Sequence, residues 1–333
     1  MSEEIDFVVT WVDGEDEVWQ DTKKKYSAHS DYGDRPERYR NWGWMRYWFR
    51  GVEKYAPWVR KIHFVTWGHL PGWLETDHPK LHIVQHEDFL PQELLPVFNS
   101  SLIERYLHRI PGLAEKFVLF NDDMFLNQPV EEEDFFQNGL PCYEALEAVI
   151  RASDVNEIYS HIMLNNISVI NARFSKRNVV RKNFFKWFNL RYGPEVFRNI
   201  CLAPWNTFQN ITNSHLPVPF LKSTFYDVWK SEPEILDATC SHQFRSITDV
   251  NQYLFRYWDI MRGKFVPKKR DGKAYHIGTG HDDYRAVTEA IRLAKGKMIC
   301  INDTPSIADF EKTVSEIHKA FESRYPDKSM FEK

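Results

Sequence analysis

Two adjacent carboxylates follow an apolar run in the segment KFVLFNDDMFLNQP, residues 116–129. Residues 117–120 read as a buried strand, and Asn121, Asp122 and Asp123 come directly after it. Ionised carboxylates are costly to bury unless a partner neutralises them. The pair therefore has two interpretations: it caps a turn in water, or it holds a cation for a negatively charged substrate. Carboxylate oxygens suit hard cations such as Mg²⁺ or Mn²⁺, which in turn bind phosphates.

Two further carboxylates, Asp6 and Asp13, lie at the two ends of a second apolar run, IDFVVTWV at residues 5–12. Ordinary roles are open to both, because Asp6 could simply open the strand and Asp13-Gly14 is a turn signal. If Asp13 and the pair after residue 120 both end strands of one sheet, they share an edge of that sheet.

Three arginines, Arg40, Arg46 and Arg50, could bind phosphate oxygens, since the fork of a guanidinium group matches them. Arg46 and Arg50 are four residues apart on one face of a helix predicted at 42–55. The same three side chains are equally compatible with ordinary surface charges.

The second half of the chain holds one more histidine and one more charged pair of interest. His215, in NSHLPVPFLKS, precedes a proline-rich apolar loop, and a lone histidine is usually structural. Arg245 and Asp249, in FRSITDVNQY, are four residues apart, which favours a helical ion pair.

Composition narrows the class of protein. The chain has 333 residues, 43% hydrophobic and 27% charged, which is typical of a soluble globular protein. Its net charge is −4 with Lys and Arg scattered, which argues against a dedicated nucleic-acid surface. An aromatic share of 15% is high and is weakly suggestive of platforms for sugar rings.

The cysteine spacing, the N-terminal sequence and the length of the apolar runs bear on the localisation of the protein. The four cysteines include no CxxC pair, so neither a zinc site nor a dense disulfide frame is predicted. The acidic start MSEEIDFVVTWVDG does not resemble a signal peptide, and no apolar run reaches the ~18 residues of a membrane span. We expect a cytoplasmic protein, with contact to the inner face of the membrane left open.

The elements that position these residues alternate between strands and helices over the first ~130 residues, which is typical of βαβ units and a mostly parallel sheet. Ligands of such sheets collect at the carboxyl ends of the strands. The predicted strands are 5–12, 61–67, 81–86 and 117–120, and the predicted helices are 42–55 and 99–110, the latter with Asn99 or Ser100 as N-cap.

The second half is predicted to be mainly helical, over 154–200, 232–260, 285–297 and 306–323. Its basic, aromatic stretch RFSKRNVVRKNFFKWFNLRYG is either an amphipathic helix with a solvated basic face or a surface for anionic lipid or a polyanionic acceptor. We predict one catalytic unit over 1–333. Its parts are a nucleotide-sugar-binding α/β part at 1–140, a helical insertion at 141–210, and the rest of the site with C-terminal helices at 211–333.

Four separated blocks together resemble the Stealth family of sugar-phosphate transferases, which includes bacterial capsular polysaccharide phosphotransferases and the catalytic subunit of N-acetylglucosamine-1-phosphotransferase. The blocks begin at IDFVVTWVDG, continue from RYRNWGWMRYWFRGVEKY through LPVFNSSLIERYLHRIPGL to FVLFNDDMFL, resume at HLPVPFLKSTFYDVW and FRSITDVNQY, and end at KMICIND. The chain lacks the large insertions of the animal enzyme and is similar to the short capsule-type members of bacteria.

This resemblance implies a glycosyltransferase-A-like, Rossmann-type α/β core with a mostly parallel sheet and a helical insertion. It also implies transfer of hexose-1-phosphate or N-acetylhexosamine-1-phosphate from a UDP-sugar to a sugar hydroxyl, with a phosphodiester as product and UMP released. The implied partners are the UDP-sugar donor, a saccharide acceptor that is free or lipid-linked, and Mg²⁺ or Mn²⁺, with no nucleic acid.

The resemblance also assigns roles to individual residues. Asp122 and Asp123 are expected to hold the metal, and His215 is expected to accept the acceptor's proton. The expected catalytic residues are His215, Arg245, Asp13 and Asp123. The expected substrate-binding residues are Asp6, Arg40, Arg46, Arg50, Asn99, Ser100, Asn121 and Asp249.

Two other functions can be compared with these sequence features. An ordinary metal-dependent glycosyltransferase of the same fold would attack the anomeric carbon and release UDP, and fold alone does not separate the two reactions. A non-catalytic carbohydrate-binding module would explain the aromatic residues, but it leaves the acidic pair, the arginines and His215 without a joint purpose.

Overall fold

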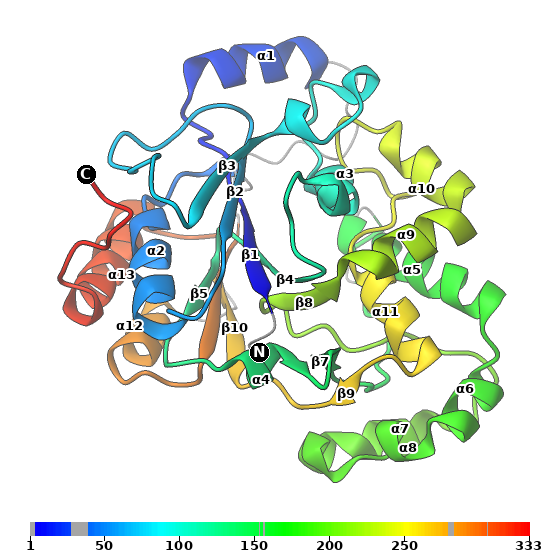
Figure 1. The fold of residues 1–333 in the computed structure, drawn as a ribbon. Helices are drawn as coiled ribbons and strands as arrows, with labels where there is room; N and C mark the ends of the chain where they lie inside the picture. The colour runs from blue at the N-terminus through cyan, green and yellow to red at the C-terminus, as the bar shows by residue number, and fades with distance from the viewer. Residues whose placement is uncertain (1–3, 28–38, 153, 156, 279–282, 305) are drawn as a thin grey trace.

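A five-stranded sheet forms the centre of the molecule (Figure 1). The structure is a computed structural model and describes residues 4–27, 39–152, 154–155, 157–278, 283–304 and 306–333. The strand order is β3-β2-β1-β4-β8. Neighbours among the first four strands are parallel, and β8 is antiparallel to β4. The strands are β1 Ile5–Thr10, β2 Ile62–Thr66, β3 Leu81–Gln85, β4 Lys116–Asn121 and β8 Val218–Leu221. The predicted α/β core with a mostly parallel sheet is confirmed.

The sheet separates two large hydrophobic cores, which explains why its strands are apolar almost throughout. Successive side chains of a strand point to opposite faces. Accordingly Val8 lies in one core and Phe7 and Val9 in the other, while in β4 Leu119 and Phe120 divide in the same way. Since both faces are covered, only the strand ends remain open to a ligand.

Helices on both faces run back from the carboxyl edge of the sheet, α2 in the core that holds Phe7 and α3 in the core that holds Val8. The predicted helix at 42–55 is α2, Met45–Tyr55, and the predicted helix at 99–110 is α3, Ser100–Tyr106, extended by a 3-10 turn at Leu107–Arg109. A helix that connects two parallel strands runs antiparallel to them, so the first turn of α2 lies at the carboxyl edge. Helix α1, Glu17–Ser27, follows β1.

A second sheet, order β10-β11-β5, was not predicted. Its strands are β10 Gly272–Ile277, β11 Met298–Asp303 and β5 Met124–Leu126, and it is accompanied by α12 Tyr284–Arg292 and α13 Phe310–Arg324. Helix was predicted over 285–297 and 306–323, and both helices are confirmed. A small third sheet consists of β6 Phe136–Gln137, β7 Leu140–Tyr143 and β9 Val266–Pro267, with α4 at Glu132–Phe135.

The region predicted to be helical, 154–200, is helical over most of its length. It contains α5 Ile158–Arg173, α6 Lys176–Lys182, α7 Phe184–Trp187, a 3-10 segment at Leu190–Val196 and α8 Phe197–Leu202. Position 156 of the predicted 154–200 helical region lies outside the described residues. None of the described helices is both long enough and apolar enough to cross a bilayer.

The continuous helix predicted over 232–260 is wrong in its middle. Helix α9, Lys222–Ser231, is followed by α10 Pro233–Cys240, and α11 begins only at Tyr253 and ends at Arg262. Residues 241–252 form a loop instead, because a buried side chain, Asp249, binds that loop in a non-helical conformation, as described below.

Candidate active site

The Asp122–Asp123 pair forms the turn between two sheets. Strand β4 of the central sheet ends at Asn121, and β5 of the second sheet begins at Met124. In the ladder with β1, Asn121 is paired with Thr10. The carboxyl ends of β1 and β4 therefore meet at one edge, which places Asp13 and the acidic pair on the same side of the sheet.

Asp123 is the centre of a three-residue cluster drawn from three parts of the chain. Its Oδ2 lies 3.4 Å from Nε2 of His215 and accepts a hydrogen bond from Sγ of Cys300 at 3.2 Å. One ligand atom from each of the three residues lies within 4.8 Å of the other two. The geometry therefore brings together Asp123 and His215, two predicted site residues separated by more than ninety positions in the sequence.

His215 is held at this site by an unusual backbone conformation. Its φ is +47°, in the left-handed region that few side chains adopt, and it lies on the loop that leads into β8. Its Nδ1 lies 3.4 Å from the hydroxyl of Tyr253. Burial alone would lower the pKa of His215, but its hydrogen bond to Asp123 and the charges of Asp123 and Glu104 outweigh burial and raise it.

A divalent cation is the cofactor that the family resemblance implies, and the residues at this turn fit one. Asp123 Oδ1 is buried and has no hydrogen-bond partner among the described residues. Desolvation within the turn and the adjacent charge of Asp123 raise the pKa of Asp122, although Asp122 is exposed to solvent and the effect of desolvation is correspondingly reduced. A cation would coordinate Oδ1 of Asp123 and would offset the negative charge of the Asp122 carboxylate.

Cys300 contributes to the cluster as a hydrogen-bond donor. Burial and the neighbouring Asp123 raise the pKa of its thiol, so Cys300 stays protonated. Only the thiolate is a strong metal ligand. Within this cluster Asp123 is therefore the carboxylate that would hold the cation, with Cys300 fixing one of its oxygens, and the predicted share of Asp122 in the metal site stays a prediction.

Asp13 lies beside a pocket at the end of β1. Its Oδ1 accepts hydrogen bonds from Asn41 Nδ2 at 3.1 Å and from the backbone of Glu15 at 3.0 Å. The pocket has a volume of about 340 Å³, within the range of small-ligand sites. Aromatic and basic side chains line it, among them Trp19, Lys23, Tyr39, Arg40 and Phe310.

Gly14, the residue after Asp13, lets the far wall of this pocket approach closely. A Cβ atom at Gly14 would lie 1.7 Å from the carbonyl oxygen of Tyr39. Any larger residue at this position would therefore displace Tyr39 and with it Arg40. Arg40 Nη1 lies 3.3 Å from both carboxylate oxygens of Asp303, at the end of β11.

Arg46 lies in the first turn of α2 and so at the carboxyl edge of the sheet. Its guanidinium carbon is 5.8 Å from the ring centre of Trp73, and its buried Nε has no hydrogen-bond partner among the described residues. The placement of Arg40 and Arg46 is compatible with donor binding, and that role stays a prediction.

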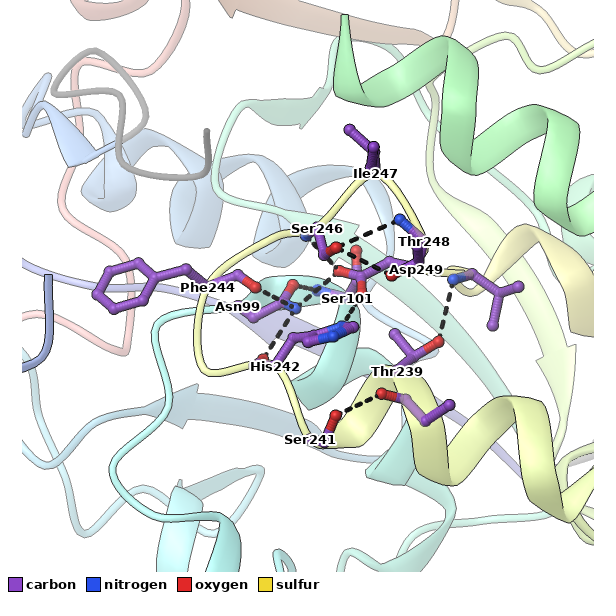
Figure 2. Close-up of polar contacts among 12 residues, drawn as sticks. Asn99, Ser101, Thr239, Ser241, His242, Phe244, Ser246, Ile247, Thr248 and Asp249 are labelled. Carbon is purple, nitrogen blue, oxygen red and sulfur yellow. Dashed lines mark hydrogen bonds and ion pairs between the residues drawn. The ribbon is translucent and has the colours of Figure 1, made fainter. Parts of the chain in front are cut away.

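Arg245 is positioned by the loop at 241–252, shown in Figure 2. The carboxylate of buried Asp249 contacts His242 Nδ1 at 2.7 Å, and it accepts hydrogen bonds from Asn99 Nδ2 at 3.0 Å and Ser246 N at 2.9 Å. Because these bonds fix the loop, the predicted helical ion pair of Arg245 with Asp249 is wrong.

Asn99 and Ser100 connect this loop to α3. Asn99 caps the helix by accepting from Ser101 N at 3.0 Å, and its Nδ2 also donates to the carbonyls of His242 and Phe244. Arg245 Nη2 donates to Ser100 Oγ at 2.5 Å. Asn99 and Asp249 are buried beneath the loop, so we interpret them as positioning residues for Arg245 rather than as substrate contacts.

Glu104 of α3 is a site residue that the sequence prediction missed. It is 3% exposed, and burial raises its pKa to about 7. The positive charges of Arg245, Arg105 and His215 oppose this rise, and the charge of Asp123 adds to it. These effects place Glu104 within electrostatic reach of Asp123, His215 and Arg245 together.

Asp6 does not lie at this edge, which corrects the prediction that it lines a donor site. It is the second residue of β1 and is paired with Phe117, near the opposite end of the sheet. Arg60 donates to both its oxygens, at 2.8 and 2.5 Å, and His63 Nε2 lies 2.9 Å from Oδ2. Its burial suits a structural ion pair.

Arg50 is likewise structural. It lies one turn beyond Arg46 on α2, away from the carboxyl edge, and it donates to both carboxylate oxygens of Glu332 at 2.7 and 2.8 Å. Its Nη1 donates to the carbonyl of Tyr325 at 2.7 Å. Arg50 therefore fastens the C-terminal segment to α2, and the prediction that it contacts the donor is wrong.

We expect Asp6→Asn to destabilise the protein by about 2–4 kcal/mol, because it leaves Arg60 and His63 without their charged partner. Hydrogen bonds from His63, Arg60 and Ala114 overcome the effect of burial and lower the pKa of Asp6. The stabilisation is thus present above about pH 4 and is lost as the pH falls through that lowered pKa. Denaturant unfolding at pH 7 and pH 3 measures this difference. A raised KM for the donor with unchanged stability would return Asp6 to the donor site.

Two family models match the chain: Stealth protein CR1, conserved region 1, over residues 3–31, and Stealth protein CR2, conserved region 2, over residues 38–142. The capsular polysaccharide phosphotransferase WcwK of Streptococcus pneumoniae is 44% identical, over 99% of this chain and 98% of its own. The exopolysaccharide phosphotransferase cps2G of Lactiplantibacillus plantarum is 39% identical, over 99% and 96%. The receptor polysaccharide phosphotransferase WefC of Streptococcus gordonii is 38% identical over 100% of both.

Solved structures are much less similar. The bifunctional glycosyltransferase WbbM gives a TM-score of 0.38 at 12% identity, with 96% of this chain and 50% of that chain covered. Mouse xyloside xylosyltransferase 1 gives 0.35 at 10% identity, with 90% and 98% covered. TM-scores this low carry no argument about the fold.

Proposed function

Because the chain belongs to the Stealth family of capsular and cell-surface polysaccharide phosphotransferases, we propose that it transfers a sugar-1-phosphate from a UDP-sugar to a sugar hydroxyl. The donor carries hexose-1-phosphate or N-acetylhexosamine-1-phosphate, the acceptor is a saccharide, free or lipid-linked, and UMP is released. The observation that carries the proposal is the contact of His215 with Asp123 at the open end of β4.

The reaction needs charge neutralisation and in-line positioning more than covalent help from the protein. The acceptor oxygen attacks the phosphorus that carries the sugar, and the bond from that phosphorus to the bridging oxygen breaks to release UMP. Arg245, fixed through Ser100, supplies a positive charge beside His215 and Glu104. A divalent cation on Asp122 and Asp123, when bound, supplies further neutralisation of the diphosphate.

The proton of the acceptor hydroxyl goes to His215. Because Nε2–H is the donor towards the carboxylate of Asp123, the neutral ring keeps its lone pair on Nδ1, the atom 3.4 Å from the Tyr253 hydroxyl. The contact through Nε2 places the base beside the residue that would hold the cation. Proximity of this kind is what a positioned general base requires.

The pocket beside Asp13 suits the nucleotide of the donor. Trp19, Tyr39 and Phe310 offer rings against which a base can stack, and Arg40 and Lys23 add positive charge near a diphosphate. The pocket and the Asp123 cluster lie at the same carboxyl edge of the sheet. A donor bound across this edge would place its sugar-bearing phosphate towards Asp123.

The identity of the released nucleotide distinguishes this reaction from that of a metal-dependent glycosyltransferase, which would use the same UDP-sugar. Incubation of the purified protein with UDP-sugars, a saccharide acceptor and Mg²⁺ is expected to yield UMP and a phosphodiester-linked product, both identified by mass spectrometry. UDP as the released nucleotide would instead establish attack at the anomeric carbon. A screen across UDP-hexoses and UDP-N-acetylhexosamines would identify the donor.

We expect Arg46→Ala to raise the KM for the UDP-sugar about 10-fold with little change in kcat, because a positioning contact acts in ground and transition states alike. Arg50→Ala is the matched control on the same helix face. It should lower the unfolding free energy by about 3 kcal/mol, through loss of the Glu332 pair, and leave KM unchanged. An unchanged KM in Arg46→Ala would assign Arg46 to the surface.

A further inference from the structure

The outer side of the helical insertion exposes an unusual number of large apolar side chains. Seventeen large hydrophobic residues are exposed in the described part of the chain, and six of them fall within residues 184–205. Leu190 is 89% exposed and Phe185 is 83% exposed. We call this set the outer patch: Phe184, Phe185, Leu190, Phe197, Ile200 and Trp205. Single exposed hydrophobic residues are normal, but a concentration of this kind marks an interaction surface.

The segment that carries the outer patch is also strongly basic. Residues 176–205 contain seven Lys and Arg and a single acidic residue, Glu195, in a chain whose net charge is −4. Arg177, Arg181 and Lys182 of α6 are exposed and form no ion pair with any described residue. Other basic side chains in this segment have structural roles: Lys176, for example, is buried and lies 2.7 Å from Glu147.

The segment that carries the outer patch is firmly attached to the protein. Trp187 is 1% exposed and stacks on Phe208 with ring centres 5.1 Å apart. Buried Asn199 donates to the carbonyls of Ala145 and Trp187 at 2.8 and 2.7 Å. Helices α6, α7 and α8 lie at the periphery of the molecule, away from the central sheet (Figure 1), and these packed residues fix the segment in place.

We propose that the outer patch docks the enzyme on an anionic lipid bilayer. Aromatic and aliphatic side chains that insert at the headgroup boundary, together with Lys and Arg that meet anionic headgroups, are the two features of a helix that lies on a membrane. The rest of the chain carries a net negative charge, so an anionic bilayer would repel it and attract the basic segment, which would orient the molecule with the outer patch towards the bilayer. This position would bring the enzyme to a lipid-linked saccharide.

Two other occupants fit the surface less well. A second copy of the chain in a two-fold dimer would set Arg177, Arg181 and Lys182 against the same charges of its partner. A soluble polyanion would use those charges but would leave Phe185 and Leu190 exposed to water. A bilayer with anionic lipid satisfies both features at once.

The test is flotation of the full chain with vesicles. Wild-type protein is expected to float with vesicles of phosphatidylcholine and anionic phosphatidylglycerol, to float far less with phosphatidylcholine alone, and to dissociate at high salt. Phe185→Ser with Leu190→Ser, and separately Arg181→Glu with Lys182→Glu, should each weaken partitioning about 10-fold or more. Turnover with a short soluble acceptor should stay unchanged in both variants.

Matched controls use other exposed apolar and basic side chains outside the outer patch. Leu293→Ser, at a residue 62% exposed, and Lys230→Glu with Arg292→Glu should float like wild type. Absence of wild-type flotation would overturn the proposal, as would equal flotation of the patch variants. So would a concentration-dependent dimer that Phe185→Ser abolishes, or salt-sensitive binding of an anionic polysaccharide without vesicle binding. Because flotation needs no turnover, its failure is distinguishable from failure of the proposed transfer reaction.

Discussion

Asp123→Ala is expected to reduce turnover by roughly 10³-fold or more, the scale of losing a group that stabilises charge in the transition state. Asp123 lies at the centre of the candidate site. It contacts His215 and Cys300, and its Oδ1 has no hydrogen-bond partner among the described residues. Asp122→Ala should reduce turnover by a comparable factor, since the proposed cation needs both carboxylates. The fold should survive, because both residues lie in a turn at the sheet edge.

The measurement is kcat at saturating donor, together with thermal unfolding of each variant. Glu87→Ala is a suitable control, because Glu87 is an exposed carboxylate away from the acidic turn. EDTA should abolish wild-type turnover and added Mg²⁺ or Mn²⁺ should restore it. Near-wild-type turnover of either aspartate variant in the presence of EDTA would contradict the metal role.

The central sheet could be predicted from the sequence because its strands are buried on both faces. A strand such as β1 or β4 then reads as a short continuous apolar run, and its six-residue length and its β-branched and aromatic residues favour a strand over a buried helix. The second sheet was missed because β10, GKAYHI, mixes exposed and buried positions and β5 has only three residues. Such short pieces become strands through pairing with β11, which local sequence does not reveal.

The loop at 241–252 shows a second limit of local patterns. The spacing of Arg245 and Asp249 favours a helix, but Asp249 forms its bonds with Asn99, about 150 residues away. A buried carboxylate with three partners outweighs the modest gain of a surface helical pair. Only the tertiary structure reveals that Asp249 positions Arg245 instead of pairing with it.

Residue type predicted the chemistry of the site better than it predicted the location of each group. Asp6 and Arg50 have suitable side chains, but neither lies at the carboxyl edge of the sheet. Asp6 is near the start of β1, and Arg50 is one turn beyond the first turn of α2. Cys300 was overlooked because the apolar run of β11 makes it read as a core position, and Glu104 because a charged residue in a predicted helix reads as a solvent-exposed side chain, although it is buried. The family resemblance implied only that His215 and Asp123 belong to one active site, and their contact is seen in the structure alone, since spacing in the sequence carries no signal for it.

His215→Gln is expected to lower kcat by roughly 10²–10⁴-fold, the range for loss of a positioned acid–base group. Glutamine keeps polarity and approximate size but cannot accept a proton near neutral pH. Donor binding should barely change, because in the proposed site the cation and the arginines, and not His215, would hold the diphosphate. The wild-type rate should also fall as the pH decreases through the pKa of His215, which Asp123 raises above its ordinary value.

Backbone strain must be separated from chemistry in this test, because His215 has a φ of +47°. Asparagine adopts this left-handed conformation more readily than most residues, so His215→Asn should keep the unfolding temperature while losing activity as His215→Gln does. Tyr253→Phe removes only the hydroxyl 3.4 Å from Nδ1 and should reduce kcat far less. A structural histidine would give the reverse pattern, with Gln tolerated and stability lost. Wild-type-like turnover of the glutamine variant would remove His215 from the mechanism and leave buried Glu104, whose pKa is raised to about 7, as the proton acceptor beside Asp123.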